Sequence, residues 1–97
     1  MLTSKERSNL RALAQTISPV TQIGKCGISE NLIKSLSEAL EARELIKVSV
    51  LNNNDDDPKQ IALELEPLLN AEVVAVTGKK IVLYRRSNKK GIEHIKF

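Results

Sequence analysis

Four consecutive residues carry the clearest chemistry in this sequence: Gly24, Lys25, Cys26 and Gly27. They follow a short β-branched run that ends at Ile23 and precede a segment with helical spacing, so we expect them to connect a strand to a helix. Two glycines three positions apart let the backbone turn sharply and approach a bulky ligand. The next helix offers unpaired N–H groups and the positive end of its dipole, and Lys25 adds a charge. Together these features suit a phosphate group.

The same pattern has a plainer explanation, in which the glycines serve only the backbone angles of a tight turn between strand and helix. The GxxG loop of KH domains uses equivalent features to clamp a nucleic-acid backbone, which keeps the binding interpretation open. A nucleotide triphosphate is disfavoured, because the loop lacks a longer glycine-rich pattern followed by Lys and Ser or Thr. Ser29 and Asn31, at the expected start of the helix, complete the candidate phosphate site.

Other positively charged residues are further candidates for contacts with an RNA backbone. Arg7 and Arg11 border the apolar stripe of the first expected helix, where an arginine can bond phosphate or simply cover the core with its stem. Lys47 lies on the polar face of an expected strand, where it serves either RNA contact or solubility. Four more lie at or after an expected hairpin turn, where solvated charges are also common: Lys79, Lys80, Arg85 and Arg86.

Catalytic and metal-dependent functions find little support in the composition. With one cysteine and one histidine, the chain cannot build a Cys or His metal cluster or an intramolecular disulfide. His94 lies three residues from the C-terminus, a poor position for a general base, so Cys26 has no evident partner for nucleophilic catalysis. The three aspartates at 55–57 lack the spacing and the glycine of a calcium loop. We therefore expect a non-catalytic protein without a cofactor or a metal.

The charges are distributed unevenly along the chain, whose formal net charge is +3. Residues 79–97 carry seven lysines and arginines against one glutamate, whereas residues 55–66 carry five carboxylates against one lysine. A basic end suggests a polyanion as partner. The aromatic residues are Tyr84 and Phe97, so binding through several stacked bases is disfavoured, and Tyr84 fits the core better than a stacking role.

The elements that must position these residues follow from the periodicity of the 97-residue chain, a length that fits one domain with a modest core. The order α-β-α-β-α-β-β allows crossovers between parallel strands and a final hairpin around Gly78. We expect an α/β (α+β) domain with a four-stranded mixed sheet and helices packed against it. The expected helices cover 3–17, a stretch after Ser29 and a stretch from Pro58; the expected strands cover 20–23, 44–51, 73–76 and 81–85.

Local signals support these bounds. Thr3 and Glu6 have the spacing of a capping box at the start of the first helix. Pro19 stops that helix, because the residue before a proline avoids helical angles. The continuous apolar run 73–76 predicts a strand covered on both faces. Pro67 lies late in the third helix and is expected to kink or end it.

Four segments, in order, are similar to the CRM domain (chloroplast RNA splicing and ribosome maturation) family in its stand-alone bacterial YhbY-type form. The combination spans residues 2 to about 86 and is far more specific than any one motif. The segments are Leu2-Thr3-Ser4-Lys5-Glu6-Arg7 with Leu10-Arg11, Ile23-Gly24-Lys25-Cys26-Gly27, Glu44-Leu45-Ile46-Lys47-Val48, and Thr77-Gly78-Lys79-Lys80-Ile81-Val82-Leu83-Tyr84-Arg85.

The resemblance implies an RNA-binding protein that acts with ribosomal RNA in large-subunit (pre-50S) assembly. It also implies a fold similar to the C-terminal domain of translation initiation factor three, with the family's GxxG loop on residues 24–27 and no role for the Cys26 thiol. We expect one domain over 1–86, a basic extension over 87–97, and a cytoplasmic monomer whose partner is RNA, with no membrane and no small-molecule substrate. The alternative is an adaptor whose acidic 55–66 segment docks a basic ribosomal protein.

Overall fold

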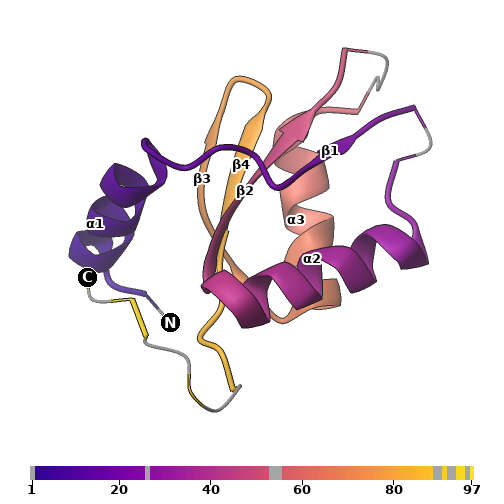
Figure 1. Cartoon of the computed structure of the whole chain (residues 1–97). Helices are drawn as coiled ribbons and strands as arrows, with labels where there is room; N and C mark the ends of the chain where they lie inside the picture. Colours follow the sequence, from indigo (N-terminus) through magenta and orange to yellow (C-terminus); the bar gives the residue numbers. More distant parts are fainter. Residues whose placement is uncertain (1, 26, 53–55, 89–90, 92–93, 96) are drawn as a thin grey trace.

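The computed structural model describes the chain except residues 1, 26, 53–55, 89–90, 92–93 and 96. The seven elements follow the expected order (Figure 1), which confirms the predicted fold class. No helix formed by these described residues is long and apolar enough to cross a membrane. The elements are α1 (Ser4–Ala14), β1 (Thr21–Ile23), α2 (Glu30–Arg43), β2 (Leu45–Val50), α3 (Pro58–Leu69), β3 (Glu72–Thr77) and β4 (Lys80–Tyr84).

The first helix begins as predicted and ends earlier. The Thr3 Oγ1 accepts a hydrogen bond from the Glu6 N–H (3.1 Å), and the Glu6 carboxylate accepts one from the Thr3 N–H (3.0 Å). The helix ends at Ala14 rather than at residue 17. The N–H groups of residues 15–17 bond carbonyls three positions back, which is a tighter turn than an α-helix. The helix therefore ends in a turn of tighter hydrogen bonding before Pro19.

The third helix also keeps its predicted start, where Asp57 caps it by accepting a hydrogen bond from the Lys59 N–H (3.0 Å). The sequence predicts that Pro67 kinks or ends this helix. Pro67 does not end the helix, since α3 continues to Leu69. A proline in the last turn removes only one N–H from the helix ladder, a loss that packing can offset. Asn70, with a left-handed φ of 52°, ends the helix instead.

The four strands form one mixed sheet in the order β1-β2-β4-β3. The pair β1 and β2 is parallel, whereas β4 lies antiparallel to both β2 and β3. In Figure 1, α1 lies on one side of the sheet, and α2 and α3 lie on the other. Two buried clusters correspond to these two sides, a larger one with α2 and α3 and a smaller one with α1.

Alternation along the strands assigns side chains to the two sides. In β2, Ile46, Val48 and Val50 enter the cluster with α2 and α3, so that Lys47 and Ser49 point to the α1 side. The predicted coverage of β3 on both faces is confirmed, because its valines and alanine divide between the two clusters. A register shift between Val73 and Ala75 makes this division possible.

The register brings the candidate loop and the hairpin turn to the same edge of the sheet. The Leu51 N–H donates to the Ile23 carbonyl (2.8 Å), just before the loop that starts at Gly24. The Val50 N–H donates to the Lys79 carbonyl (2.7 Å), in the turn between β3 and β4. Because neighbouring strands lie about 5 Å apart, the ends of β1 and β4 are separated by roughly 10 Å.

A buried glutamate joins the end of α2 to the C-terminal residues. Glu44 is fully buried, and its carboxylate accepts hydrogen bonds from the N–H groups of Ser87 (2.7 Å) and Ile95 (2.8 Å). The His94 Nδ1 lies 2.6 Å from the same carboxylate. Burial alone would raise the pKa of Glu44, but these bonds and the charge of His94 together lower it below the ordinary value of 4.5. The carboxylate is therefore ionised where it is buried.

Candidate functional site

The glycine loop has the backbone that its sequence predicts. Gly27 has a φ of 68°, and its N–H donates to the Gly24 carbonyl (3.0 Å), which closes a tight turn. A Cβ atom added at Gly27 would meet no described atom within 4 Å, so the glycine is required for its backbone angle rather than for space. Lys25 is exposed at this turn, while Cys26 lies outside the described residues.

The start of α2 follows this loop directly. The Ser29 hydroxyl caps the helix by accepting a hydrogen bond from the Leu32 N–H (3.1 Å), so its oxygen already has a structural task. Asn31 is exposed in the first turn beside Glu30. The Glu30 carboxylate offsets part of the positive potential at this helix end. Attraction for a phosphate must therefore come chiefly from Lys25.

A second positively charged place lies between α1 and the open part of the sheet. A groove of about 260 Å³ brings together three cations that are far apart in the sequence, Arg11, Lys47 and Lys80. None of the described residues that line it is acidic. We call this hollow the basic groove; its lining is Arg11, Ala14, Gln15, Lys47, Ala75, Thr77, Lys80 and Val82.

The fold explains why the cations of the basic groove meet. Lys80 pairs with Ser49 across the β2–β4 ladder, and its Nζ donates to the Ser49 hydroxyl (3.0 Å). Lys47 lies two residues from Ser49 on the same face of β2. Leu10 and Ala14 of α1 pack on this face, and the exposed Arg11 lines the groove. Like charges held this closely favour an anion between them.

The remaining predicted cations are placed less favourably for contact with an RNA backbone. Arg7 is about half exposed, and its Nη2 lies 4.0 Å from the Glu72 carboxylate, a distance at which solvent screens the pair. Arg86 is exposed but shares a shallow hollow with two carboxylates, those of Glu6 and Glu72. Lys79 is exposed in the hairpin turn, at the same edge of the sheet as the glycine loop.

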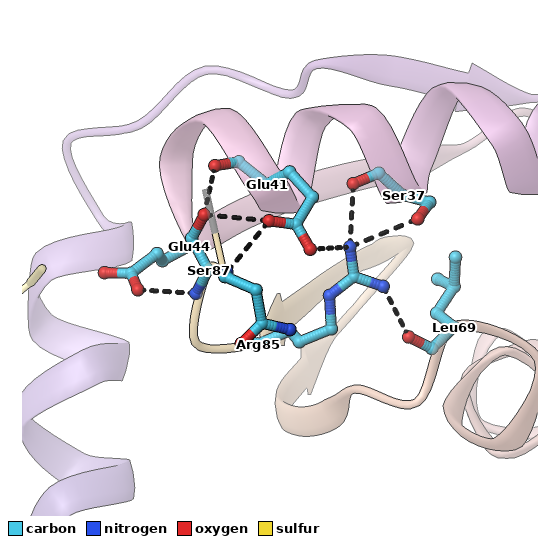
Figure 2. Close-up of polar contacts among 7 residues, drawn as sticks. Ser37, Glu41, Glu44, Leu69, Arg85 and Ser87 are labelled. Carbon is cyan, nitrogen blue, oxygen red and sulfur yellow. Dashed lines mark hydrogen bonds and ion pairs between the residues drawn. The ribbon is translucent and has the colours of Figure 1, made fainter. Parts of the chain in front are cut away.

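Arg85 corrects the sequence prediction, because its guanidinium faces the interior of the protein (Figure 2). Nη1 donates to the Leu69 carbonyl (2.8 Å), and Nη2 donates to the Ser37 carbonyl (2.9 Å). Nη2 also forms an ion pair with the Glu41 carboxylate (3.3 Å). These bonds tie the residue after β4 to the C-terminal half of α2 and to the end of α3, so we exclude Arg85 from the candidate binding surface.

Tyr84 is part of the core on the α1 side rather than a surface for stacked bases, although its burial is incomplete. Its ring packs edge-on against Phe97, with the ring centroids 5.1 Å apart. Burial and the neighbouring Glu44 charge are the leading causes that raise the pKa of the Tyr84 hydroxyl. Sequence reasoning identified neither the buried role of Glu44 nor the part of Gln15 and Thr77 in the groove, although Gln15 follows Arg11 at a spacing of four.

Known proteins resemble this chain over almost its whole length. The sequence model of the family described as "CRS1 / YhbY (CRM) domain" matches residues 2–85. "Probable RNA-binding protein YqeI" of Bacillus subtilis is 46% identical over 87 residues, which cover 90% of this chain and 91% of that protein. "Probable RNA-binding protein MJ0652" of Methanocaldococcus jannaschii is 42% identical over 86 residues, covering 87% of this chain and 63% of that protein.

A solved structure shares the architecture. The solution structure of the hypothetical protein SAV1595 from Staphylococcus aureus superposes with a TM-score of 0.79 at 50% sequence identity. The superposition covers 98% of this chain and all of that chain. Together with the family match, this agreement over both full lengths supports the resemblance inferred from four short segments.

Proposed function

The chain belongs to the CRS1/YhbY (CRM) domain family, and from that premise we propose that it binds RNA through the glycine loop and the basic groove. The two relatives compared above are named as RNA-binding proteins and not as enzymes, which agrees with the expectation of a non-catalytic function. The observation that carries the proposal is the basic groove, where three cations share one hollow and no described lining residue is acidic.

The RNA backbone runs, in this proposal, along one edge of the sheet. One phosphate lies at Gly24, Lys25 and Gly27, close to the start of α2, where the positive end of the helix dipole and one lysine favour an anion. The chain then passes the hairpin turn with Lys79 and enters the basic groove. The roughly 10 Å between the ends of β1 and β4 is short enough for one RNA segment to contact both places.

Recognition rests on phosphate geometry and RNA shape more than on the bases. Both aromatic side chains of the protein, Tyr84 and Phe97, pack against each other and are half-buried, which leaves little aromatic surface for stacked bases. Arg7 and Arg86, next to the Glu72 carboxylate, contribute less than the groove, and Ser29 contributes through the helix end that it caps. Cys26 and Asn31 also belong to the proposed RNA-binding region, and we assign no particular RNA contact to either.

We further propose that the RNA is ribosomal RNA of the large subunit and that the protein acts on pre-50S particles in the cytoplasm as a monomer. The resemblance of the chain to the CRM domain (chloroplast RNA splicing and ribosome maturation) family supports this finer assignment. The domain of residues 1–86 would carry the binding surface. The bonds of Ser87, His94 and Ile95 to Glu44 support the interpretation of 87–97 as an extension of the same domain.

The adaptor alternative loses support from two carboxylates of its acidic segment. Asp57 caps α3, and the Glu66 carboxylate accepts a hydrogen bond from the Val73 N–H (2.9 Å), so both serve the fold. Asp55 lies outside the described residues. Charge reversal at Asp56 and Glu64 separates the hypotheses, because it should leave ribosomal association unchanged if RNA contacts carry it.

The test of the proposal is the binding of a structured large-subunit rRNA fragment across a salt series, for the wild type and for Lys25→Glu. A phosphate contact at the loop predicts that the variant binds unrelated RNA sequences more weakly and that its salt dependence is flatter by about one unit of slope. Thermal stability should barely change, because Lys25 is exposed. Unchanged affinity of the folded variant would remove the loop from the proposal, and no binding by the wild type at low salt would overturn it.

A further inference from the structure

The side of the molecule away from the basic groove has a hollow of its own. It measures about 620 Å³ and lies between α2 and α3. We propose that this hollow docks a positively charged amphipathic helix of a protein partner, and we call it the helix groove. Its lining residues are Ile28, Ser29, Glu30, Ile33, Lys34, Ser37, Glu38 and Leu68.

The floor of the helix groove is apolar and incompletely covered. Leu68 of α3 is 56% exposed, although Leu65 and Leu69 beside it are buried. Ile28 and Ile33 pack against the larger core cluster from below and still line the hollow. Three large apolar side chains therefore form one continuous strip on the surface. Such a strip is suited to receive apolar side chains from a partner.

The charges around the helix groove select the partner. Glu30, Lys34 and Glu38 follow one another at intervals of four on α2, so that two carboxylates flank one cation along the rim. Among the residues that line the hollow there are two carboxylates and one cation, so its rim carries a net negative charge. Away from the glycine loop, this rim favours lysine and arginine over a phosphate backbone. The complementary partner is a positively charged protein segment rather than RNA.

The shape of the groove suits a helix. Its α2 wall extends from Ser29 to Glu38, about 14 Å at 1.5 Å per residue, which matches between two and three turns of a docked helix. Leu68 forms the opposite wall. A partner helix with leucines at positions i, i+4 and i+7 would place them on this strip and its lysines beside the carboxylates. The sheet lies between the basic groove and the helix groove, so these two grooves can be occupied together, and the helix groove approaches the glycine loop only at its Ser29 end.

The experiment titrates the isotopically labelled full-length protein with a synthetic helical peptide that has leucines at i, i+4 and i+7 and lysines elsewhere. We expect NMR shift changes at the methyl groups of Ile28, Ile33 and Leu68. Leu68→Ser should weaken binding about tenfold, because the variant lacks the apolar side chain that the peptide would bury. The matched control is Leu63→Ser, since Leu63 lies on the same helix, is 61% exposed and does not line the groove.

A second variant tests the charge without touching the apolar floor. Glu38→Lys should also weaken the lysine peptide, and a peptide with glutamates in place of its lysines should not bind the wild type. The inference is overturned if shifts map elsewhere, if Leu63→Ser weakens binding as much as Leu68→Ser, or if a single-stranded RNA oligonucleotide displaces the peptide from the methyl groups of Leu68. Affinity of Leu68→Ser for rRNA should stay at the wild-type value, so this test succeeds or fails separately from RNA binding.

Discussion

The two sides of the sheet carry opposite charge although the same strands build both. On the α1 side, Arg11, Lys47 and Lys80 meet in a groove without an acidic residue among its described lining. On the other side, the groove between α2 and α3 has an apolar floor and a rim with two glutamates and one lysine. One side is suited to a polyanion and the other to an apolar, positively charged segment.

This difference shows how a small sheet separates two binding chemistries. The alternation in β2 sends Ile46, Val48 and Val50 into one core and leaves Lys47 and Ser49 on the other face. On the α1 side, the half-buried Lys47 and the exposed Lys80 of the strands line the basic groove. The helices α2 and α3 instead cover their face and present their own outer surfaces.

Charge reversal in the basic groove should have the strongest effect. In the double variant Arg11→Glu with Lys80→Glu, RNA affinity at low salt should fall about 100-fold, because two phosphate contacts become repulsive. The slope of log affinity against log salt should flatten by about two. The control double variant, Lys34→Glu with Lys59→Glu, reverses as many charges on the other side. Equal losses in both would show that only net charge matters and that the two sides do not differ.

Truncation of Arg85 should affect folding rather than RNA. Arg85→Met removes the bonds to Leu69, Ser37 and Glu41, which join α2 and α3 to the residue after β4. We expect a loss of about 3 kcal/mol in the free energy of unfolding, measured with urea, because buried partners are left unpaired. The neighbouring exposed Arg86→Met should change it by less than about 0.5 kcal/mol. A large loss of RNA affinity by folded Arg85→Met would return this residue to the binding surface.

The buried Glu44 should make stability depend on pH. Its pKa is lower in the folded than in the unfolded chain, so its contribution is complete above the ordinary value of 4.5 and is lost as pH falls through the folded pKa. Glu44→Gln should lose about 2 kcal/mol of unfolding free energy at neutral pH. That difference should shrink as pH falls below 4.5. If the unfolding free energies of the wild type and of Glu44→Gln depended on pH in the same way, this role of Glu44 would be contradicted.

Because Glu44 holds Ser87 and Ile95, its loss should also loosen the α1 side, where Ile95 and Phe97 pack. Hydrogen exchange should therefore rise in α1 more than in α3. Equal increases in the two helices would indicate that the C-terminal residues support both sides alike.

Two glycines allow a smaller and cleaner comparison. Gly27 and Gly78 have φ values of 68° and 57°, and neither has a described atom within 4 Å of an added Cβ. Alanine at either position should cost about 1 kcal/mol of stability through the same backbone strain. Gly27→Ala should also lower RNA affinity by several fold, and by more than Gly78→Ala does, because only Gly27 lies in the glycine loop. Equal affinities of the two variants would favour the plain-turn explanation of that loop.

Local chemistry was readable from the sequence. The capping box of Thr3 and Glu6, the cap at Ser29 and the proline start of α3 each depend on residues within four positions of one another. The apolar alternation of β2 likewise reports which face is buried. The RNA contacts of the loop and groove residues stay predictions, although the residue types and their exposure support them.

Strand order and long-range bonds were decided by the tertiary structure alone. The placement of β4 between β2 and β3 brings Lys80 next to Ser49 and Lys47, which a hairpin pattern by itself does not require. The burial of Arg85 depends on Ser37, 48 positions away. Adjacent arginines 85 and 86 look alike in the sequence, because a long flexible side chain takes its partner from whatever the fold brings near it. The sequence determines periodicity and charge, while packing decides which charges meet a partner and which remain for a ligand.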